Sequence, residues 1–151
     1  MDTVSRQKRS LIMSHIRSRC TGPEKTLRKL IRSLVGMKTR LVWNAKQLPG
    51  TPDVYIPSRK LAIFVDGCFF HRCPRHGHLP KSNIMYWRAK LARNVRRDHR
   101  TDRELRNLGI SVVRFWEHEL SRHGKGDIPL HVRRLRILSP GATPLITPKP
   151  R

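Results

Sequence analysis

The sequence has 151 residues, and its 33 Lys and Arg against 10 Asp and Glu give a formal net charge of +23. The length favours a single domain, and a hydrophobic content of 37% can fill a modest core, which excludes a disordered basic tail. No apolar run approaches the roughly 18–20 residues that cross a bilayer. The N-terminal residues carry no apolar segment of the secretory type. We therefore expect neither a transmembrane nor a secreted protein.

The excess of positive charge predicts a polyanionic partner, because such a chain repels itself unless negative charge binds to it. Nucleic acid is the favoured partner, since neutralised phosphates release counterions, and an anionic membrane surface is the weaker alternative. A generally basic proteome would also explain the charge without any partner.

Residues 1–19 are basic and carry a short apolar stripe, which predicts an N-terminal helix or arm. The arm either docks on the core or lies against DNA with basic side chains on phosphates, and both alternatives stay open. In the second case the phosphate contacts come from Arg6, Lys8, Arg9 and Arg17. A helix is predicted to follow, with Thr21 and Glu24 as its capping box and Gly36 as its stop.

Three short apolar runs predict strands over residues 40–44, 53–56 and 61–65. The turn at 57–60 makes the last two a hairpin. The third run is nearly all apolar, which suits a strand buried on both faces.

An irregular Cys- and His-rich loop over residues 67–81 leads into a long arginine-covered helix over 83–108 and a fourth strand over 110–116. A short helix is predicted over 127–138. The Pro-rich residues 139–151 are expected to form a flexible tail, which leaves 1–138 as the predicted single domain. The order of these elements predicts an α/β or α+β fold with a small mixed sheet.

Asp53 opens the second predicted strand, directly after a Pro-Gly-Thr-Pro turn. A carboxylate at the start of a strand, facing a second strand across a hairpin, suits Mg²⁺, which prefers oxygen ligands. Such a metal would offset the charge that develops at a phosphodiester. A plain turn dipeptide is the alternative explanation for Pro-Asp.

Cys68, Cys73 and three histidines lie within a dozen residues and supply the ligand types of tetrahedral Zn²⁺. His118, just after the fourth strand, is the candidate for a further ligand from outside the loop. The alternative is a loop with reduced cysteines and no metal. Cys20 stands alone and is interpreted as a buried or inert thiol.

Among basic side chains, two aromatic residues, Phe69 and Phe70, lie in this loop and a third, Trp87, lies just beyond it. Flat rings in such a setting suit insertion between base steps, whereas the alternative is that they belong to the core. Two adjacent aromatics cannot easily both face inward from a strand, so we expect at least one to be exposed. His71 follows them directly, and its chemistry allows either a zinc ligand or a general acid or base.

Four ordered segments carry a resemblance to a known family. They are Pro49-Gly50-Thr51-Pro52-Asp53, Ile63-Phe64-Val65-Asp66-Gly67-Cys68-Phe69-Phe70-His71, Asn94-Val95-Arg96-Arg97-Asp98 and Val113-Arg114-Phe115-Trp116-Glu117. With this order and spacing the sequence resembles the very-short-patch repair (Vsr) DNA mismatch endonucleases, from about Ser10 to Leu120.

The resemblance implies a PD-(D/E)xK-type, restriction-endonuclease-like core with a small mixed sheet, flanking helices and a structural zinc site. It implies Mg²⁺-dependent nicking of one strand on the 5′ side of the mispaired T in a T:G mismatch, which arises when 5-methylcytosine deaminates. Asp53 would bind Mg²⁺ with the backbone carbonyl of Val65, and Glu24 would assist the metal-water site. His71 would act at the scissile phosphate rather than on zinc.

The same resemblance assigns contacts to DNA. The aromatic residues Phe69, Phe70 and Trp87 would form a wedge beside the mismatch, and the N-terminal helix around Met13 would approach from the minor groove. Further DNA contacts are expected from Arg17, Lys90 and Arg93. The partner is double-stranded DNA with a T:G mismatch, the expected setting is the bacterial cytoplasm at the nucleoid, and mismatch-repair proteins are a further candidate partner. One basic domain acting on one site suggests a monomer.

The sequence also departs from the usual family pattern at several positions. The Glu-x-Lys half of the nuclease signature is absent, as it is in the family generally. Asp66 stands where some members have His, and it could add a metal or base contact. His118 replaces a frequent Cys, which predicts a Cys₂His₂ zinc site of Cys68, Cys73, His76 and His118; His76 is preferred to His78 because its spacing from Cys73 suits a tight loop.

Three other functions remain open at this level. One is a related nuclease of different DNA specificity. Another is a non-catalytic, zinc-stabilised DNA-binding protein, which would keep the cysteines and the basic helix without needing Asp53 or His71. The third is a basic ribosome- or RNA-associated protein.

Overall fold

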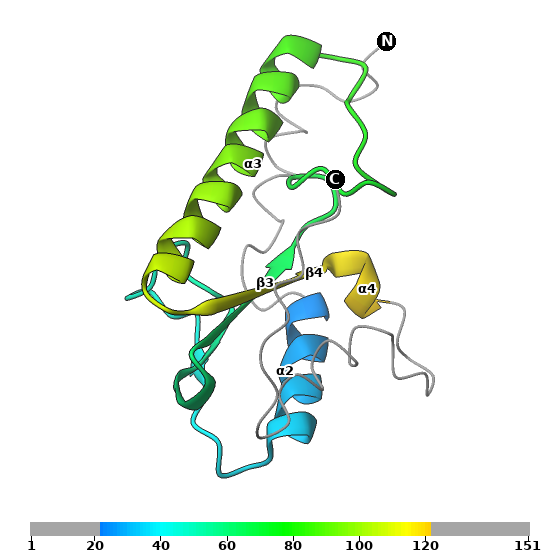
Figure 1. The fold of residues 1–151 in the computed structure, drawn as a ribbon. Helices are drawn as coiled ribbons and strands as arrows, with labels where there is room; N and C mark the ends of the chain where they lie inside the picture. Colours follow the sequence, from blue (N-terminus) through cyan, green and yellow to red (C-terminus); the bar gives the residue numbers. More distant parts are fainter. Residues whose placement is uncertain (1–21, 122–151) are drawn as a thin grey trace.

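The computed structural model describes residues 22–121, which contain the four-stranded sheet and its flanking helices (Figure 1). The predicted N-terminal arm, the helix at 127–138 and the Pro-rich tail lie outside the described residues, as do Met13, Arg17, Cys20 and Thr21. Among residues 22–121 no helix is long and apolar enough to cross a membrane.

The elements follow the predicted order, with one addition. Helix α2 (Gly22–Val35) precedes the strands β1 (Val42–Trp43), β2 (Val54–Ile56) and β3 (Leu61–Asp66), and a single 3₁₀ turn η1 (Pro57–Arg59) joins β2 to β3. Helix α3 (Ile84–Asn107) and strand β4 (Ser111–Trp116) complete the sheet. The added element is a short helix, α4 (Glu117–Ser121), which follows β4 without a break.

The sheet is mixed, with the strand order β1-β2-β3-β4. Strands β1, β2 and β3 pair antiparallel, as the predicted hairpin requires, and β4 pairs parallel with β3. A parallel partner needs a long crossover connection, which α3 supplies. The register sets Phe64 opposite Arg114 and Asp66 opposite Trp116.

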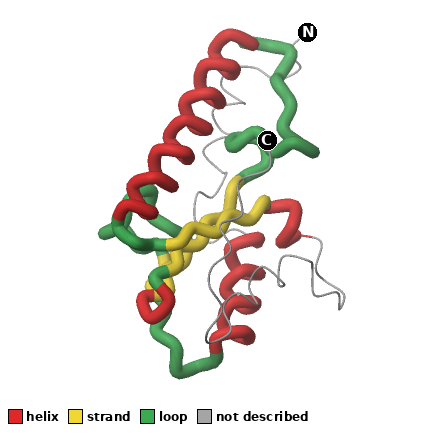
Figure 2. The backbone as a smooth tube through the Cα atoms, viewed as in Figure 1, coloured by secondary structure: helices red, strands yellow, loops and turns green. Residues whose placement is uncertain are grey.

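Helices cover both faces of the sheet, as Figure 2 shows with the strands between them. Because side chains alternate along a strand, Leu61 and Ile63 of β3 join one core with α2 and α4, and Ala62 and Phe64 join a second core with Leu105 of α3. Strand β3 is therefore buried on both faces, which confirms the prediction from its apolar sequence. The next residues along β3 keep this alternation, so Asp66 belongs to the face that α3 covers.

Candidate active site and metal-ligand cluster

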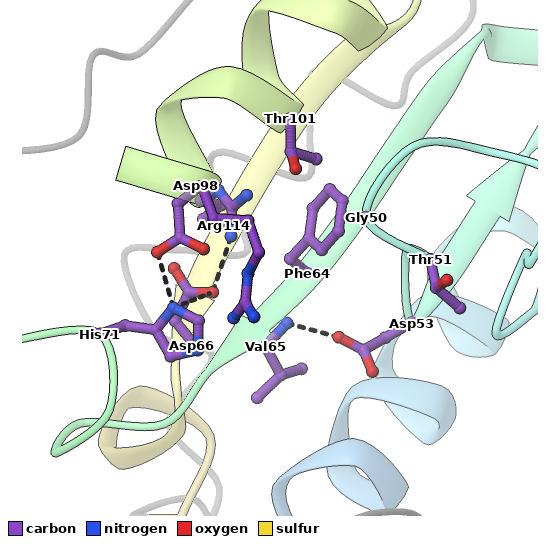
Figure 3. A pocket seen from close by; sticks show the side chains of 11 residues that line it. Gly50, Thr51, Asp53, Phe64, Val65, Asp66, His71, Asp98, Thr101 and Arg114 are labelled. Atoms are coloured by element: carbon purple, nitrogen blue, oxygen red, sulfur yellow. Dashed lines mark hydrogen bonds and ion pairs between the residues drawn. The ribbon is translucent and has the colours of Figure 1, made fainter. Parts of the chain in front are cut away.

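An open pocket lies where the ends of β3 and β4 meet the middle of α3 and the loop that precedes β2 (Figure 3). Charged groups dominate its wall. The lining residues are Gly50, Thr51, Asp53, Phe64, Val65, Asp66, His71, Arg97, Asp98, Thr101 and Arg114. The structure thus brings Asp53, Val65, Asp66 and His71, which the sequence singled out, into one site.

The loop before β2 reaches the pocket because Gly50 approaches α3 closely. Gly50 has a φ of +73°, and a Cβ added there would collide with the methyl group of Thr101. Glycine meets both demands, since it adopts positive φ readily and has no side chain. The close approach fixes the loop against α3 and so places the start of β2, with Asp53, beside β3.

Asp53 is held by a main-chain hydrogen bond across the hairpin, in which the Val65 N–H donates to its Oδ2 at 2.7 Å. Burial raises the pKa of Asp53 from 3.8 to about 6, against the lowering effect of the bond from Val65. The nearby charges of Glu24 and Asp66 also raise this pKa, whereas Arg114 lowers it. A desolvated carboxylate with further carboxylates in range favours a bound cation. Glu24 acts on Asp53 from helix α2, so this helix contributes negative charge to the site.

His71 is oriented by α3. Its Nδ1 lies 2.7 Å from Oδ2 of the buried Asp98 and 3.6 Å from Oδ1 of the buried Asp66. Because an ionised Asp98 can only accept, Nδ1 carries the hydrogen, and Nε2 is the nitrogen that remains for proton exchange. Asn94 fixes the same loop to α3 by donating a hydrogen bond from Nδ2 to the Phe70 carbonyl at 3.1 Å.

A second group of side chains could hold a metal ion. It consists of Cys68, Cys73, His76 and His118, whose ligand atoms all lie within 4.8 Å of one another. The Cys73 Sγ lies 3.6 Å from Nδ1 of His118 and 3.8 Å from Nδ1 of His76. Tetrahedral Zn²⁺ with Cys and His ligands separates neighbouring ligand atoms by about 3.3–3.8 Å. The 3.0 Å between Cys68 Sγ and His118 Nδ1 is shorter and would open when a metal binds.

The cluster has the surroundings of a structural metal site. Both cysteines are buried, and burial raises the pKa of Cys68 to about 11, so its thiolate needs a cation. Gly77 closes the loop through a hydrogen bond to the Cys73 carbonyl, and a Cβ there would lie 2.6 Å from that oxygen. The donor set fits zinc, and neither His71 nor His78 belongs to this cluster.

The aromatic residues pack against one another, with Phe69 and Phe70 on the loop of the cysteines and Trp87 in α3. Phe69 packs edge-on against Phe70 and Trp87, with ring centroids 5.1 Å apart in both pairs. Both phenylalanines are of intermediate burial, so the prediction that at least one of them is exposed is wrong. Lys90, one turn along α3, holds its Nζ 5.2 Å from the Trp87 ring centroid, and Arg93 is exposed on the next turn.

Comparison with known proteins places the chain in a family. The family model of the DNA mismatch endonuclease Vsr matches residues 1–76. A type II nicking enzyme of Xanthomonas oryzae pv. oryzae is 43% identical over 141 residues, which cover 92% of this chain and 98% of that protein. The DNA mismatch endonuclease Vsr of Escherichia coli is 34% identical over 119 residues, covering 77% and 73%. The chain belongs to the Vsr family.

Membership confirms the predicted restriction-endonuclease-like fold and identifies this Vsr-family chain as a DNA endonuclease, a hydrolase of phosphodiester bonds. A type II nicking enzyme of Lentzea aerocolonigenes, 42% identical over 114 residues that cover 74% of this chain and 68% of that protein, agrees with this class. A non-catalytic binding protein is thereby excluded.

The Vsr-family chain also contains a buried ionic network that sequence reasoning missed. Arg114 donates from Nη1 to Oδ1 of Asp66 at 2.8 Å, and from Nε and Nη2 to Oδ1 of Asp102 at 3.0 and 2.9 Å. Its guanidinium also lies 4.3 Å from the ring centroid of Phe64. Two signals could have revealed it: an arginine inside an otherwise apolar strand, and aspartates at 98 and 102 on the apolar face of α3.

Proposed function

We propose that this Vsr-family endonuclease nicks one DNA strand on the 5′ side of the mispaired T in a T:G mismatch, and that it requires Mg²⁺. The observation that carries the proposal is the convergence of a desolvated carboxylate, Asp53, and an oriented histidine, His71, in one open pocket. Phe69 and Phe70 on the loop of His71, together with Trp87 in α3, provide a means to recognise a weakened base pair.

Asp53 is the proposed magnesium ligand, with the main-chain carbonyl of Val65 as its neighbour. The donors fit a hard cation, because the carboxylate is desolvated and lies in the field of Glu24 and Asp66. When bound, Mg²⁺ supplies an acidified water and offsets the charge of the phosphate. Glu24 is proposed to orient water at this position.

His71 is the proposed proton-transfer residue. The bond from Nδ1 to Asp98 fixes the ring and leaves Nε2 to exchange a proton with the attacking water or the leaving oxygen. The negative charge of Asp98 also stabilises the imidazolium that forms when Nε2 takes a proton.

Mismatch selection is proposed to rest on Phe69, Phe70 and Trp87. A T:G step costs less to unstack than a paired step, so flat side chains that enter it discriminate by deformability. Positive charge supplies affinity without sequence information, with contacts proposed from Arg17, Lys90 and Arg93, and Met13 is proposed to approach the minor groove. Zn²⁺ in the Cys₂His₂ cluster is proposed to hold the loop that carries Phe69 and Phe70. Action as a monomer and assistance by mismatch-repair proteins stay predictions.

Strand nicking tests the proposal. End-labelled duplexes with T:G in varied contexts, and matched T:A controls, are incubated with the protein and Mg²⁺. We expect one cut 5′ of the mispaired T that is lost on chelation, restored by Mg²⁺ and absent from T:A. Equal cutting of both duplexes would refute the mismatch specificity, and cutting in chelator would refute the metal requirement.

A pair of variants tests the metal ligand separately. Asp53→Asn removes a carboxylate from the pocket, whereas Glu104→Gln removes one from a residue of α3 that does not line the pocket and that pairs with Arg100 at 2.8 Å. We expect Asp53→Asn to abolish nicking and weaken binding of Mn²⁺, followed by electron paramagnetic resonance, while Glu104→Gln changes neither. Unchanged Mn²⁺ binding in Asp53→Asn would show that the ligand is another residue.

A further inference from the structure

Two arginines line the pocket, and their surroundings differ. Arg114 is buried, and three of its N–H groups already bond to Asp66 and Asp102. Arg97 is exposed at the rim. Within residues 22–121, no hydrogen bond or ion pair engages the guanidinium of Arg97.

The charges of the pocket wall show that Arg114 alone does not offer a free positive charge to a phosphodiester. Asp53, Asp66 and Asp98 line the wall and would repel an entering phosphodiester. The charge of Arg114 is offset by the two carboxylates that it contacts, and its pKa is raised by them against the effect of burial. Of the two arginines that line the pocket, Arg97 is therefore the one whose positive charge is available to an anion.

The position of Arg97 on α3 ties it to the reacting groups. Arg97 directly precedes Asp98, whose carboxylate holds His71 at 2.7 Å, and it lies one helical turn before Thr101, which also lines the pocket. Residues four apart share one face of a helix. The helical turn therefore fixes the backbone of Arg97 relative to His71, and its exposed side chain lines the pocket.

We propose that Arg97 is a catalytic residue that donates hydrogen bonds to non-bridging oxygens of the scissile phosphate. This inference rests on the proposed function, since it takes the pocket to be where the phosphate reacts. Arg97 keeps all its protons throughout, and its fixed positive charge acts as charge builds on the equatorial oxygens. Arg114 serves instead as a positioning residue that holds Asp66 beside His71.

Arg96 offers a matched control for this inference. It is the adjacent residue of α3, is equally an exposed arginine, and does not line the pocket. Arg97→Gln and Arg96→Gln therefore remove the same charge from the same helix, about 100° apart around its axis. Equal melting temperatures would establish that both variants fold.

The first measurement is the single-turnover nicking rate at saturating T:G duplex and Mg²⁺. Loss of one preorganised donor to the developing charge lowers such rates by about 10²-fold, which we expect for Arg97→Gln, with partial recovery in Arg97→Lys. Arg96→Gln should stay within a few-fold of the unchanged protein. Equal rates in the two glutamine variants would overturn the proposal.

The second measurement separates this inference from the proposed function. The affinity for matched T:A duplex, without Mg²⁺, is followed by fluorescence anisotropy against salt concentration. Loss of one phosphate contact should reduce the slope of log affinity against log salt by about 0.9 in Arg97→Gln, and not in Arg96→Gln. A protein that nicks no T:G duplex but shows this difference in slope would refute the proposed function and support the contact by Arg97; equal slopes would overturn the contact.

Discussion

Replacing Arg114 with methionine should destabilise the fold strongly, because it removes the cation from a buried ionic network. The side chain of Arg114 is 10% exposed, and those of its partners Asp66 and Asp102 are 4% and 11% exposed. Methionine retains an unbranched side chain of similar reach over the Phe64 ring. The change therefore removes charge and hydrogen bonds with little loss of packing.

The size of the effect follows from burial. Removing one partner of a buried ion pair costs about 3–5 kcal/mol, since the remaining charge has no counter-charge and little water. Domains have a total stability of about 5–15 kcal/mol. Each kcal/mol lowers the melting temperature of a chain of this size by roughly 2–4 °C, so Arg114→Met should melt on the order of 10 °C lower.

Urea unfolding with zinc present and magnesium absent measures the loss, and α3 supplies the control. Arg100 Nε lies 2.8 Å from Glu104 Oε1, the same separation as in the Arg114–Asp66 pair, but these side chains are 76% and 41% exposed. Arg100→Met should leave the unfolding midpoint unchanged within error. Adding Asp66→Asn and Asp102→Asn to Arg114→Met should recover most of the loss. Equal losses in the two Arg→Met variants would refute the assignment of the effect to burial.

Three further changes test the site. Because burial raises the pKa of Asp53 from 3.8 to about 6, its proton stabilises the metal-free fold below pH 3.8, and this contribution is lost as pH rises through 6. The urea midpoint of Asp53→Asn should not fall over this pH range. A pH profile identical to that of the unchanged protein would contradict the raised pKa of Asp53. His76→Asn should lose bound zinc by native mass spectrometry while His78→Asn keeps it, and the reverse would exchange the two ligands. Gly50→Ala should cost about 1–3 kcal/mol in urea unfolding, partly recovered by Thr101→Ser, whereas full stability would show that the loop moves freely.

Much of the fold could be predicted because local signals and long-range packing agree. The stop at Gly36, the turn at 57–60 and the apolar run 61–65 each match an element boundary in the structure. Helix α4 was missed, since it follows β4 without a turn residue and spans five residues. Its packing against α2, rather than its local sequence, accounts for it.

The site could be predicted where a residue type carries its own chemistry. Cys68 and Cys73 indicate a metal by their thiols, and the structure places His76 and His118 with them. Arg114 and Asp102 could not be found in this way, because charged residues on a strand or helix usually face water. Their burial depends on the parallel pairing of β3 with β4 beneath α3, which no single segment of the sequence encodes.

Side chains alternate between the two faces of β3, so this strand contributes both to the contact with Asp53 and to the ionic network of Arg114. Val65 points away from α3 and donates its N–H to Asp53, whereas Phe64 and Asp66 face α3 and meet Arg114. Beyond the strand this alternation ends, and a small buried cluster of Cys68, Cys73 and Trp116 holds the loop. This cluster fixes the loop because Cys68 and Cys73 bracket the aromatic pair and His71. Bonds from α3 then hold the same loop from its other side, so the orientation of His71 depends on two anchors that are distant in sequence.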